Sequence, residues 1–331
     1  MTFPRVDLIH GPTPLEPLTQ LSNYLDIDLW VKRDDLAGVS FGGNKSRQLE
    51  YYLGAAKAED ADVILITGAV QSNFVRTAAA YAAKLGMKAI VQLEDRVPDR
   101  DDLYANSGNV LLSRILGAEV VHYPVGEDEG GADKALYDRA ALLKEQGRRP
   151  YVIPLAMGKP PLGALGYQRG AAELIAQDDG FDAVVVASGS GMTHSGMVAG
   201  FAATDTIVHG SCVRRPKTLQ YPRIHQLLDQ FQTMTGEDLK LTADDVQIWD
   251  DALAPGYGQM GPLSVEAMRL AAELEGMILD PVYTAKSFAG VIGLVRAGVI
   301  EKGAKVAFVN TGGLSAFFAY QQDIELAFGL D

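Results

Sequence analysis

The sequence predicts an α/β protein with parallel-sheet cores and flanking helices, and two observations support this class. Short apolar runs that are typical of buried strands alternate with helical segments along most of the chain. Strands that are separated by helices form parallel sheets with right-handed crossovers, covered by helices on both faces. The length of 331 residues is sufficient for two domains.

The first half of the chain begins with an extended, proline-rich arm and a strand at 29–33. Regular alternation follows. Apolar runs give the strands, and Ala- and Leu-rich stretches closed by glycine or polar residues give the helices. The expected helices are 46–58, 74–85, 107–116 and 131–146, and the expected strands are 63–66, 89–93, 119–123 and 151–154.

The segment 158–163 interrupts this alternation with two glycines and two prolines, and we interpret it as a boundary between lobes. The alternation then resumes, although 236–262 is less regular. The expected helices are 164–176, 194–203, 219–235, 264–275 and 286–297, and the expected strands are 183–187, 206–212 and 305–309.

The composition excludes several kinds of partner and site. A net charge of −13 and a pI of about 4.8 disfavour nucleic acid and anionic membranes as partners. Cys212 is the only cysteine, which excludes an internal disulfide and fits a reducing compartment. The first residues lack the apolar core of a signal peptide, and no apolar stretch approaches membrane-spanning length, so we expect a cytoplasmic protein. The five histidines show no metal-ligand spacing, so we expect no metal site.

The first candidate site is the glycine turn at 41–47, which delivers Lys45 to the start of a helix. There the positive end of the helix dipole favours a neutral amine, which can attack an aldehyde. Taken alone, the segment favours a solvated lysine at a helix start. The spacing from Gly38 to Gly43 fits a phosphate-binding P-loop, but Asn44 occupies the position of its lysine, which argues against a nucleoside triphosphatase.

A second glycine-rich loop, at 188–196, follows an apolar strand and opens a helix. This arrangement directs several backbone N–H groups to one point, which suits a phosphate dianion, and Ser190 and Thr193 can add hydroxyl donors. A dinucleotide-binding fingerprint fits less well because His194 stands where its third glycine belongs. A glycine-rich turn without a ligand is the remaining alternative.

Three further groups of polar residues are candidates. Gln71, Ser72 and Asn73 form another strand-to-helix junction, where a lone serine is typically an N-cap. Together they offer donors for a substrate carboxylate or a phenolic oxygen.

The other two groups are Tyr257 with Tyr283 and Arg214 with Arg215. Buried tyrosines are more often packing residues than acids or bases. The two arginines are typical of a solvated surface pair, and their alternative use is to attract an anionic substrate group.

The chain resembles the D-cysteine desulfhydrase and 1-aminocyclopropane-1-carboxylate deaminase family in three segments: Gly42-Gly43-Asn44-Lys45-Ser46-Arg47, Gln71-Ser72-Asn73 and Asp280-Pro281-Val282-Tyr283. This family belongs to the pyridoxal phosphate (PLP) enzymes of fold type II, the tryptophan synthase β-like class. The resemblance implies two domains with PLP in the cleft between them. The expected large domain comprises 1–47 and 159–331, and the smaller inserted α/β domain comprises 48–158.

The resemblance also implies roles for the motif residues. Lys45 would hold PLP as a Schiff base, and Asn73 would contact its phenolic oxygen. Ser72, with Gln71 and Asn73, would bind the substrate carboxylate. The phosphate would lie on Ser190, Gly191, Met192 and Thr193, and the reacting carbons would lie near Tyr257 and Tyr283.

Some positions depart from the family pattern. Thr284 stands where the deaminases carry a glutamate against the pyridine nitrogen, and Thr311 where they carry a leucine. We expect both threonines at the cofactor. A hydroxyl leaves that nitrogen more nearly neutral, which suits β-elimination and disfavours opening of a cyclopropane ring. Gln48 replaces a lysine near the phosphate, and Phe74 replaces a polar residue near the substrate.

We therefore expect a homodimeric PLP-dependent lyase that acts on a small β-substituted alanine. D-cysteine is the first candidate, with pyruvate, ammonia and sulfide as products. The alternatives are an L-cysteate sulfo-lyase, in which Arg214 or Arg215 meets the sulfonate, and a lyase for another β-substituted amino acid. A 1-aminocyclopropane-1-carboxylate deaminase fits less well, and a PLP-binding protein without turnover is the alternative from a different class.

Overall fold

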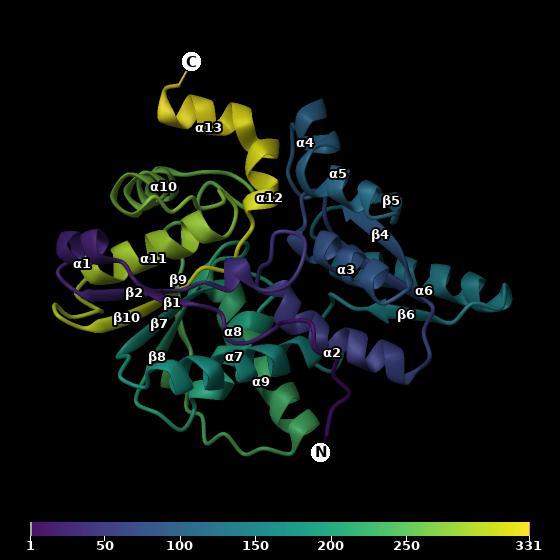
Figure 1. Ribbon diagram of the computed structural model, residues 1–331, viewed down its shortest axis with the longest axis horizontal. Coiled ribbons are helices and arrows are strands. Elements are labelled where there is room, and N and C mark those ends of the chain that lie inside the picture. Colours follow the sequence, from purple (N-terminus) through teal and green to yellow (C-terminus); the bar gives the residue numbers. More distant parts are fainter. Residues whose placement is uncertain (1, 331) are drawn as a thin grey trace.

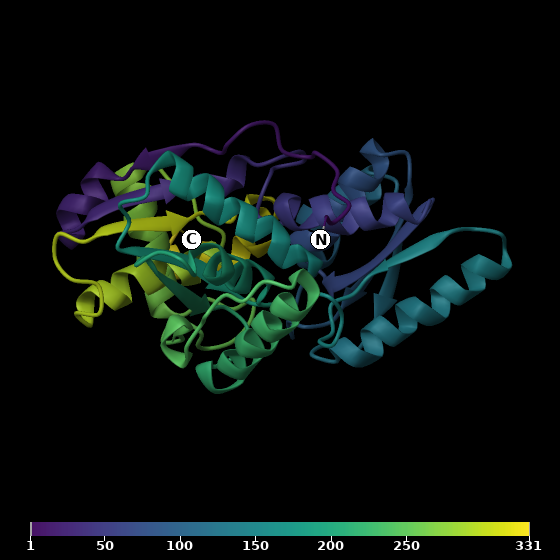
Figure 2. The same ribbon diagram turned by 90° about the horizontal axis from the view of Figure 1, so that it is seen from below.

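The computed structural model describes residues 2–330 and contains two β-sheets that lie side by side (Figures 1 and 2). The larger sheet has the strand order β1-β2-β10-β7-β8-β9 and is parallel except for β1, which pairs antiparallel with β2. Its strands are β1 (Leu15–Pro17), β2 (Asp28–Lys32), β7 (Ala183–Ser188), β8 (Ile207–Cys212), β9 (Gln247–Trp249) and β10 (Lys305–Val309).

The smaller sheet is fully parallel, with the strand order β5-β4-β3-β6. Its strands are β3 (Val63–Ala69), β4 (Lys88–Glu94), β5 (Glu119–Tyr123) and β6 (Pro150–Ile153). All four lie within the segment expected to form the inserted domain.

Helices cover both faces of each sheet, as expected for parallel strands (Figure 1). The first eight are α1 (Thr19–Leu25), α2 (Lys45–Ala58), α3 (Asn73–Lys84), α4 (Asp102–Asn106), α5 (Gly108–Ile115), α6 (Glu129–Glu145), α7 (Leu162–Gln177) and α8 (Met192–Phe201). The remaining five are α9 (Lys217–Thr235), α10 (Pro262–Glu275), α11 (Thr284–Arg296), α12 (Leu314–Phe317) and α13 (Gln321–Phe328).

The core around the larger sheet follows the two-residue period of its central strand β7. Val185 packs with the helices α1, α10 and α11 on one face of the sheet. Val184 and Val186 pack with α7, α8 and α9 on the other. All six residues of β7 are buried, so the strand is a continuous apolar run rather than an alternating one.

The helix α2 begins where the two halves of the molecule meet, and most of its residues are buried (Figure 1). It packs against α7 and α3, and it crosses the domain boundary that the sequence predicted at residue 47. A side chain at Gly166 of α7 would come within 2.1 Å of the Arg47 carbonyl oxygen, so only glycine permits this close approach. The start of α2, which carries Lys45, is therefore held by direct backbone packing.

The sequence prediction missed several short elements. The segment 1–28 is not simply an extended arm, because it contains β1 and α1. The three-residue strand β9 lies in the segment that looked irregular, and α12, the 3₁₀ helix η3 (Phe318–Tyr320) and α13 follow the last predicted strand. These elements are too short to show a clear hydrophobic period, and pairing with neighbouring elements forms them. No helix within residues 2–330 is long and apolar enough to cross a membrane.

Candidate active site

A cavity opens where the strands of the two sheets end and the following helices begin. Its walls contain most of the residues that the sequence singled out and, within residues 2–330, no carboxylate. The lining residues are Asn44, Lys45, Ser72, Asn73, Phe74, Ala187, Gly189, Ser190, Gly191, Thr193, Tyr283, Thr311 and Gly312.

Lys45 projects into this cavity from the first position of α2. Among the described residues, its amine has no hydrogen-bond or ion-pair partner, and the Phe74 ring centroid lies 5.4 Å from Nζ. Its side chain is only partly exposed, and burial lowers its pKa to about 8. An ammonium ion gains little here to offset its desolvation, so a larger share of the amine is neutral and nucleophilic than in a solvated lysine.

Two other lysines are buried, but neither has a free amine. The Lys286 amine donates to the carbonyl oxygens of Leu253 and Gly256, at 2.8 and 2.5 Å. The Lys32 amine contacts Glu173 at 2.5 Å. Lys45 is therefore the lysine that is available for covalent chemistry.

The loop after β7 forms a cradle for an anion. Gly191 precedes α8 with φ of +102°, and a side chain there would come within 2.4 Å of Leu227. On the outer side of the loop, Gln220 donates to the Gly189 carbonyl oxygen at 3.1 Å, and Arg223 donates to the Ser190 carbonyl oxygen at 2.8 Å. Because the carbonyls point outward, the loop N–H groups are left for the cavity beside the N-terminus of α8.

Thr193 is oriented by two amide groups from α2 and the turn before it. Asn44 Nδ2 and Gln48 Nε2 both donate to Thr193 Oγ1, at 3.0 and 2.9 Å. Since this oxygen accepts two hydrogen bonds, its own proton is directed to another acceptor, which fits an anion in the cradle. The structure thereby gives Gln48 a role that the sequence did not reveal.

Asn73 presents its amide nitrogen to the cavity, because its oxygen is already occupied. Asn73 Oδ1 accepts from Asn109 Nδ2 at 2.9 Å and from Ser315 Oγ at 3.2 Å. Arg76, which is fully buried, contacts the same oxygen at 3.5 Å and donates to the Gly42 carbonyl oxygen at 3.4 Å. One guanidinium group thus connects Asn73 with the turn that carries Lys45.

The hydroxyls of Tyr257 and Tyr283 are hydrogen-bonded to each other at 2.5 Å. Burial raises the pKa of both phenols, that of Tyr283 well above its usual value, so both are protonated at neutral pH. One shared hydrogen bond leaves one phenolic proton free to be donated. Lys286 fixes the Gly256 carbonyl, and Asp280 accepts from the Tyr283 N–H at 3.0 Å.

Three predicted site residues are placed differently from the prediction. The Gln71 amide does not line the cavity, because its nitrogen donates to two backbone carbonyls and its oxygen accepts from Asn109 N at 2.9 Å. Thr284 lies outside the cavity lining and donates to Asp280 Oδ1 at 2.7 Å. Met192 opens α8 without lining the cavity, whereas Thr311 does line it.

Ser72 is the N-cap of α3, since Oγ accepts from Val75 N at 3.3 Å, and it also lines the cavity. The ordinary N-cap interpretation of this serine is confirmed. Its position in the cavity wall is a separate feature, which depends on the neighbouring segments and not on the cap.

A second space continues beyond Lys45 and the tyrosine pair, and Arg96 and Arg214 line it. Only 3% of the Arg214 side chain and 15% of that of Arg215 are exposed, so the interpretation as a solvated surface pair is wrong. Both arginines are kept inside by Glu129, at 2.6 Å each.

Some of these residues had a signal in the sequence, and others had none. Gln48 lies four positions after Asn44 and Arg76 four after Ser72, so helical spacing places each pair on one face. Arg96, Asn109, Glu129 and Ser315 reach the site only through the tertiary fold. Within residues 2–330, no cluster of three potential ligand residues is positioned to hold a metal ion.

Comparison with known proteins agrees with this geometry. The chain belongs to the pyridoxal-phosphate dependent enzyme family, whose model matches residues 6–312. It is 40% identical over 328 residues to D-cysteine desulfhydrases of Salmonella typhi and of Salmonella choleraesuis strain SC-B67, covering 97% of this chain and 98% of each relative. The family predicted from the sequence motifs is confirmed.

Solved structures show the same fold. A crystal structure of an ACC deaminase homologue superposes with a TM-score of 0.88 and 36% identity, covering 98% of this chain and 97% of that chain. A hydrogen sulfide-producing enzyme from Fusobacterium nucleatum gives a TM-score of 0.65 at 17% identity, covering 93% of this chain and 97% of its own. The second likeness concerns the fold alone.

The residues present fit PLP, the cofactor of this family. Lys45 has the free amine that its aldehyde requires, and the cradle at 189–193 suits its phosphate. Asn73 would offer an amide nitrogen to the ring, and Thr311, which also lines the cavity, would offer a hydroxyl.

The lowered pKa of Lys45 predicts how the rate of covalent PLP binding depends on pH. The rate at which the apoprotein binds PLP covalently should rise with pH and level off above about 8, because the amine loses its proton near that pH. Stopped-flow absorbance over a pH series measures this rate. A rate that still climbs towards the usual pKa of 10.5 would show an ordinary, solvated amine.

Proposed function

We propose that the protein is a D-cysteine desulfhydrase-like lyase, which converts D-cysteine and water to pyruvate, ammonia and hydrogen sulfide. The main observation that supports this proposal is the unpaired amine of Lys45, which shares one cavity with an anion cradle and a tyrosine pair. The 40% identity to D-cysteine desulfhydrases supports the choice of substrate.

Bound PLP supplies an electron sink that makes the Cα proton of the amino acid acidic. Lys45 is the base that takes this proton, because it is the free amine in the cavity and its lowered pKa leaves it partly neutral. The Phe74 ring beside it limits access of water to the amine.

The substrate carboxylate would be held at the start of α3, where Ser72 and Asn73 line the cavity. The hydroxyl of Ser72 and the N-terminal N–H groups of the helix suit an anion. Gln71 supports this site indirectly, since its amide fastens the turn to the backbone at Tyr104 and Ser107.

The bond from Cβ to sulfur breaks next to Tyr257 and Tyr283, whose shared hydrogen bond leaves one proton for the departing sulfur. Within the described residues, no carboxylate lines either part of the cavity. These walls would therefore offer no acidic group to protonate the ring nitrogen of bound PLP, and this favours loss of a good leaving group over opening of a cyclopropane ring.

Replacing the lysine tests this assignment. Lys45→Ala should abolish both the visible absorbance band of the purified protein and the release of pyruvate from D-cysteine, because no other buried amine is free to replace it. Spectra and a pyruvate assay measure the two losses. Lys286→Met is the comparison variant and should retain the band; full turnover by Lys45→Ala would overturn the assignment.

A second candidate function is elimination from an amino acid with an anionic group on Cβ, such as L-cysteate. The observation that favours it is the pair Arg96 and Arg214 in the space beyond the tyrosines. Nη2 of each is buried at 2.7 or 2.8 Å from a glutamate, yet neither makes a well-aligned hydrogen bond within the described residues. A sulfonate would compete with these glutamates for the guanidinium donors.

Substrate comparison distinguishes the two candidates. If the substrate is anionic at Cβ, Arg214→Gln should lower kcat/KM for L-cysteate roughly 10- to 100-fold, the equivalent of a lost charge-assisted hydrogen bond, and change that for D-cysteine and 3-chloro-D-alanine much less. Arg139→Gln, which removes an arginine from an exposed ion pair, is the control. Equal losses of kcat/KM on all substrates would mean that Arg214 maintains the shape of the cavity and does not bind the sulfonate.

We also propose that the protein is a cytoplasmic homodimer, as its resemblance to the family implies. Large apolar side chains that are exposed on the adjoining α5 and α12–η3 segments support a contact between copies; they include Ile115 and Phe318. Sedimentation equilibrium should then give twice the chain mass of 35.5 kDa, and a monomer at all concentrations would contradict the proposal.

A further inference from the structure

Glu129, at the start of α6 in the smaller domain, forms ion pairs with three arginines of the larger domain. Its carboxylate lies 2.6 Å from Arg214 Nη1, 2.6 Å from Arg215 Nη2 and 3.1 Å from Arg223 Nη1. Only 12% of its side chain is exposed. The pairs therefore lie between the domains and are poorly screened by solvent.

Two of these arginines also hold the loop that forms the anion cradle. Arg215 Nη1 donates to the Gly189 carbonyl oxygen at 3.2 Å, and Arg223 Nε donates to the Ser190 carbonyl oxygen at 2.8 Å. One carboxylate of the smaller domain is thus connected, through two guanidinium groups, to the backbone whose N–H groups face the cavity.

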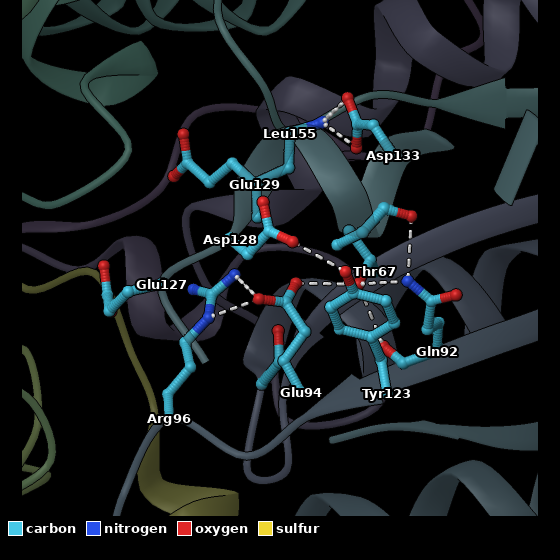
Figure 3. A network of polar contacts seen from close by, with 12 residues as sticks. Thr67, Gln92, Glu94, Arg96, Tyr123, Glu127, Asp128, Glu129, Asp133 and Leu155 are labelled. Carbon is cyan, nitrogen blue, oxygen red and sulfur yellow. Dashed lines mark hydrogen bonds and ion pairs between the residues drawn. The ribbon is translucent and has the colours of Figure 1, made fainter. Parts of the chain in front are cut away.

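The segment that carries Glu129 is anchored firmly to its own domain (Figure 3). Asp128 turns towards Tyr123 and accepts from its hydroxyl at 2.7 Å, whereas Glu127 and Glu129 point to the opposite side. Asp133, one turn further along α6, accepts from Leu155 N at 3.0 Å. The backbone that carries Glu129 is therefore fixed to the smaller domain.

Glu129 is the essential residue among these ion pairs because it supplies the negative charge. It is the only carboxylate paired with all three arginines; Glu127, which is about half exposed, pairs only with Arg214 in the described part of the chain. Burial raises the pKa of Glu129, but the three guanidinium groups outweigh burial and hold this pKa below its usual value. Without this carboxylate, Arg215 and Arg223 would have no anionic partner.

We propose that Glu129 is a positioning residue that controls the shape of the phosphate cradle from the smaller domain. Glu129 orients Arg215 and Arg223, and these hold the loop carbonyls outward so that the loop N–H groups meet the cofactor phosphate. The proposal rests on the cofactor and not on the choice of substrate.

The test measures how fast the holoenzyme loses PLP after dilution, followed by its visible absorbance. Glu129→Gln removes the charge with little change of shape and should speed the loss roughly tenfold, the scale of one charge-assisted hydrogen bond. Glu129→Asp should restore part of the retention. An electrostatic effect alone predicts the opposite sign, because removing a negative charge near a phosphate slows its release.

The control is Glu119→Gln, which removes the same charge from the same domain but from an exposed ion pair with Arg139. It should leave cofactor loss unchanged. The proposal would be overturned if the two Gln variants lost PLP at the same rate. It would also be overturned if Glu129→Gln lost PLP more slowly than the unmodified protein. Thermal unfolding of each variant identifies any that is misfolded.

A second variant tests the connection itself. Arg223→Lys keeps a positive charge for Glu129 but removes the Nε donor to the Ser190 carbonyl oxygen. It should speed cofactor loss by a similar factor, and the double variant Glu129→Gln/Arg223→Lys should be little worse than either single variant. Effects that multiply in the double variant would show that the two residues act independently and would overturn the coupling.

Discussion

The unpaired amine of Lys45 is the constraint on which the rest of the structure depends. The chain carries a net charge of −13, yet no carboxylate of the described residues lines the cavity around this amine. The nearby carboxylates are bound elsewhere: Asp34 to Arg47, Glu94 to Arg96, and Asp280 to the first N–H groups of α11. An amine without a counter-ion in a buried site has a lowered pKa and remains a nucleophile.

The same kind of interaction, between a buried cation and main-chain carbonyls, holds the segments around that amine. Arg76 and Lys286 are buried cations whose donors bind main-chain carbonyls, those of Gly42 and Gly256, respectively. Each carbonyl belongs to a turn that carries a site residue. Cations bound in this way fix the turns without placing a carboxylate beside Lys45, which an ordinary buried salt bridge would risk.

The alternation of strands and helices could be predicted because parallel strands such as β3 and β7 are continuous apolar runs and the intervening helices are long. The elements β1, β9 and α12 could not, because three or four residues carry no measurable period. The site motifs could be recognised in the sequence because glycine turns and helix N-caps are determined by the residues next to them. The side-chain directions of Gln71 and Thr284 were misjudged because Asn109 and Asp280, their partners, compete with the cavity for them.

The sequence alone determined the α/β class, the family and the lysine, since these depend on local patterns and on motifs that are contiguous in the chain. Tertiary structure decided which polar groups are free to act. Asn73 presents its nitrogen because Asn109 and Ser315 occupy its oxygen, and Arg214 is buried because Glu129 reaches it from the other domain. A polar group is available for chemistry only when its neighbours leave it unpaired, and those neighbours are distant in the sequence.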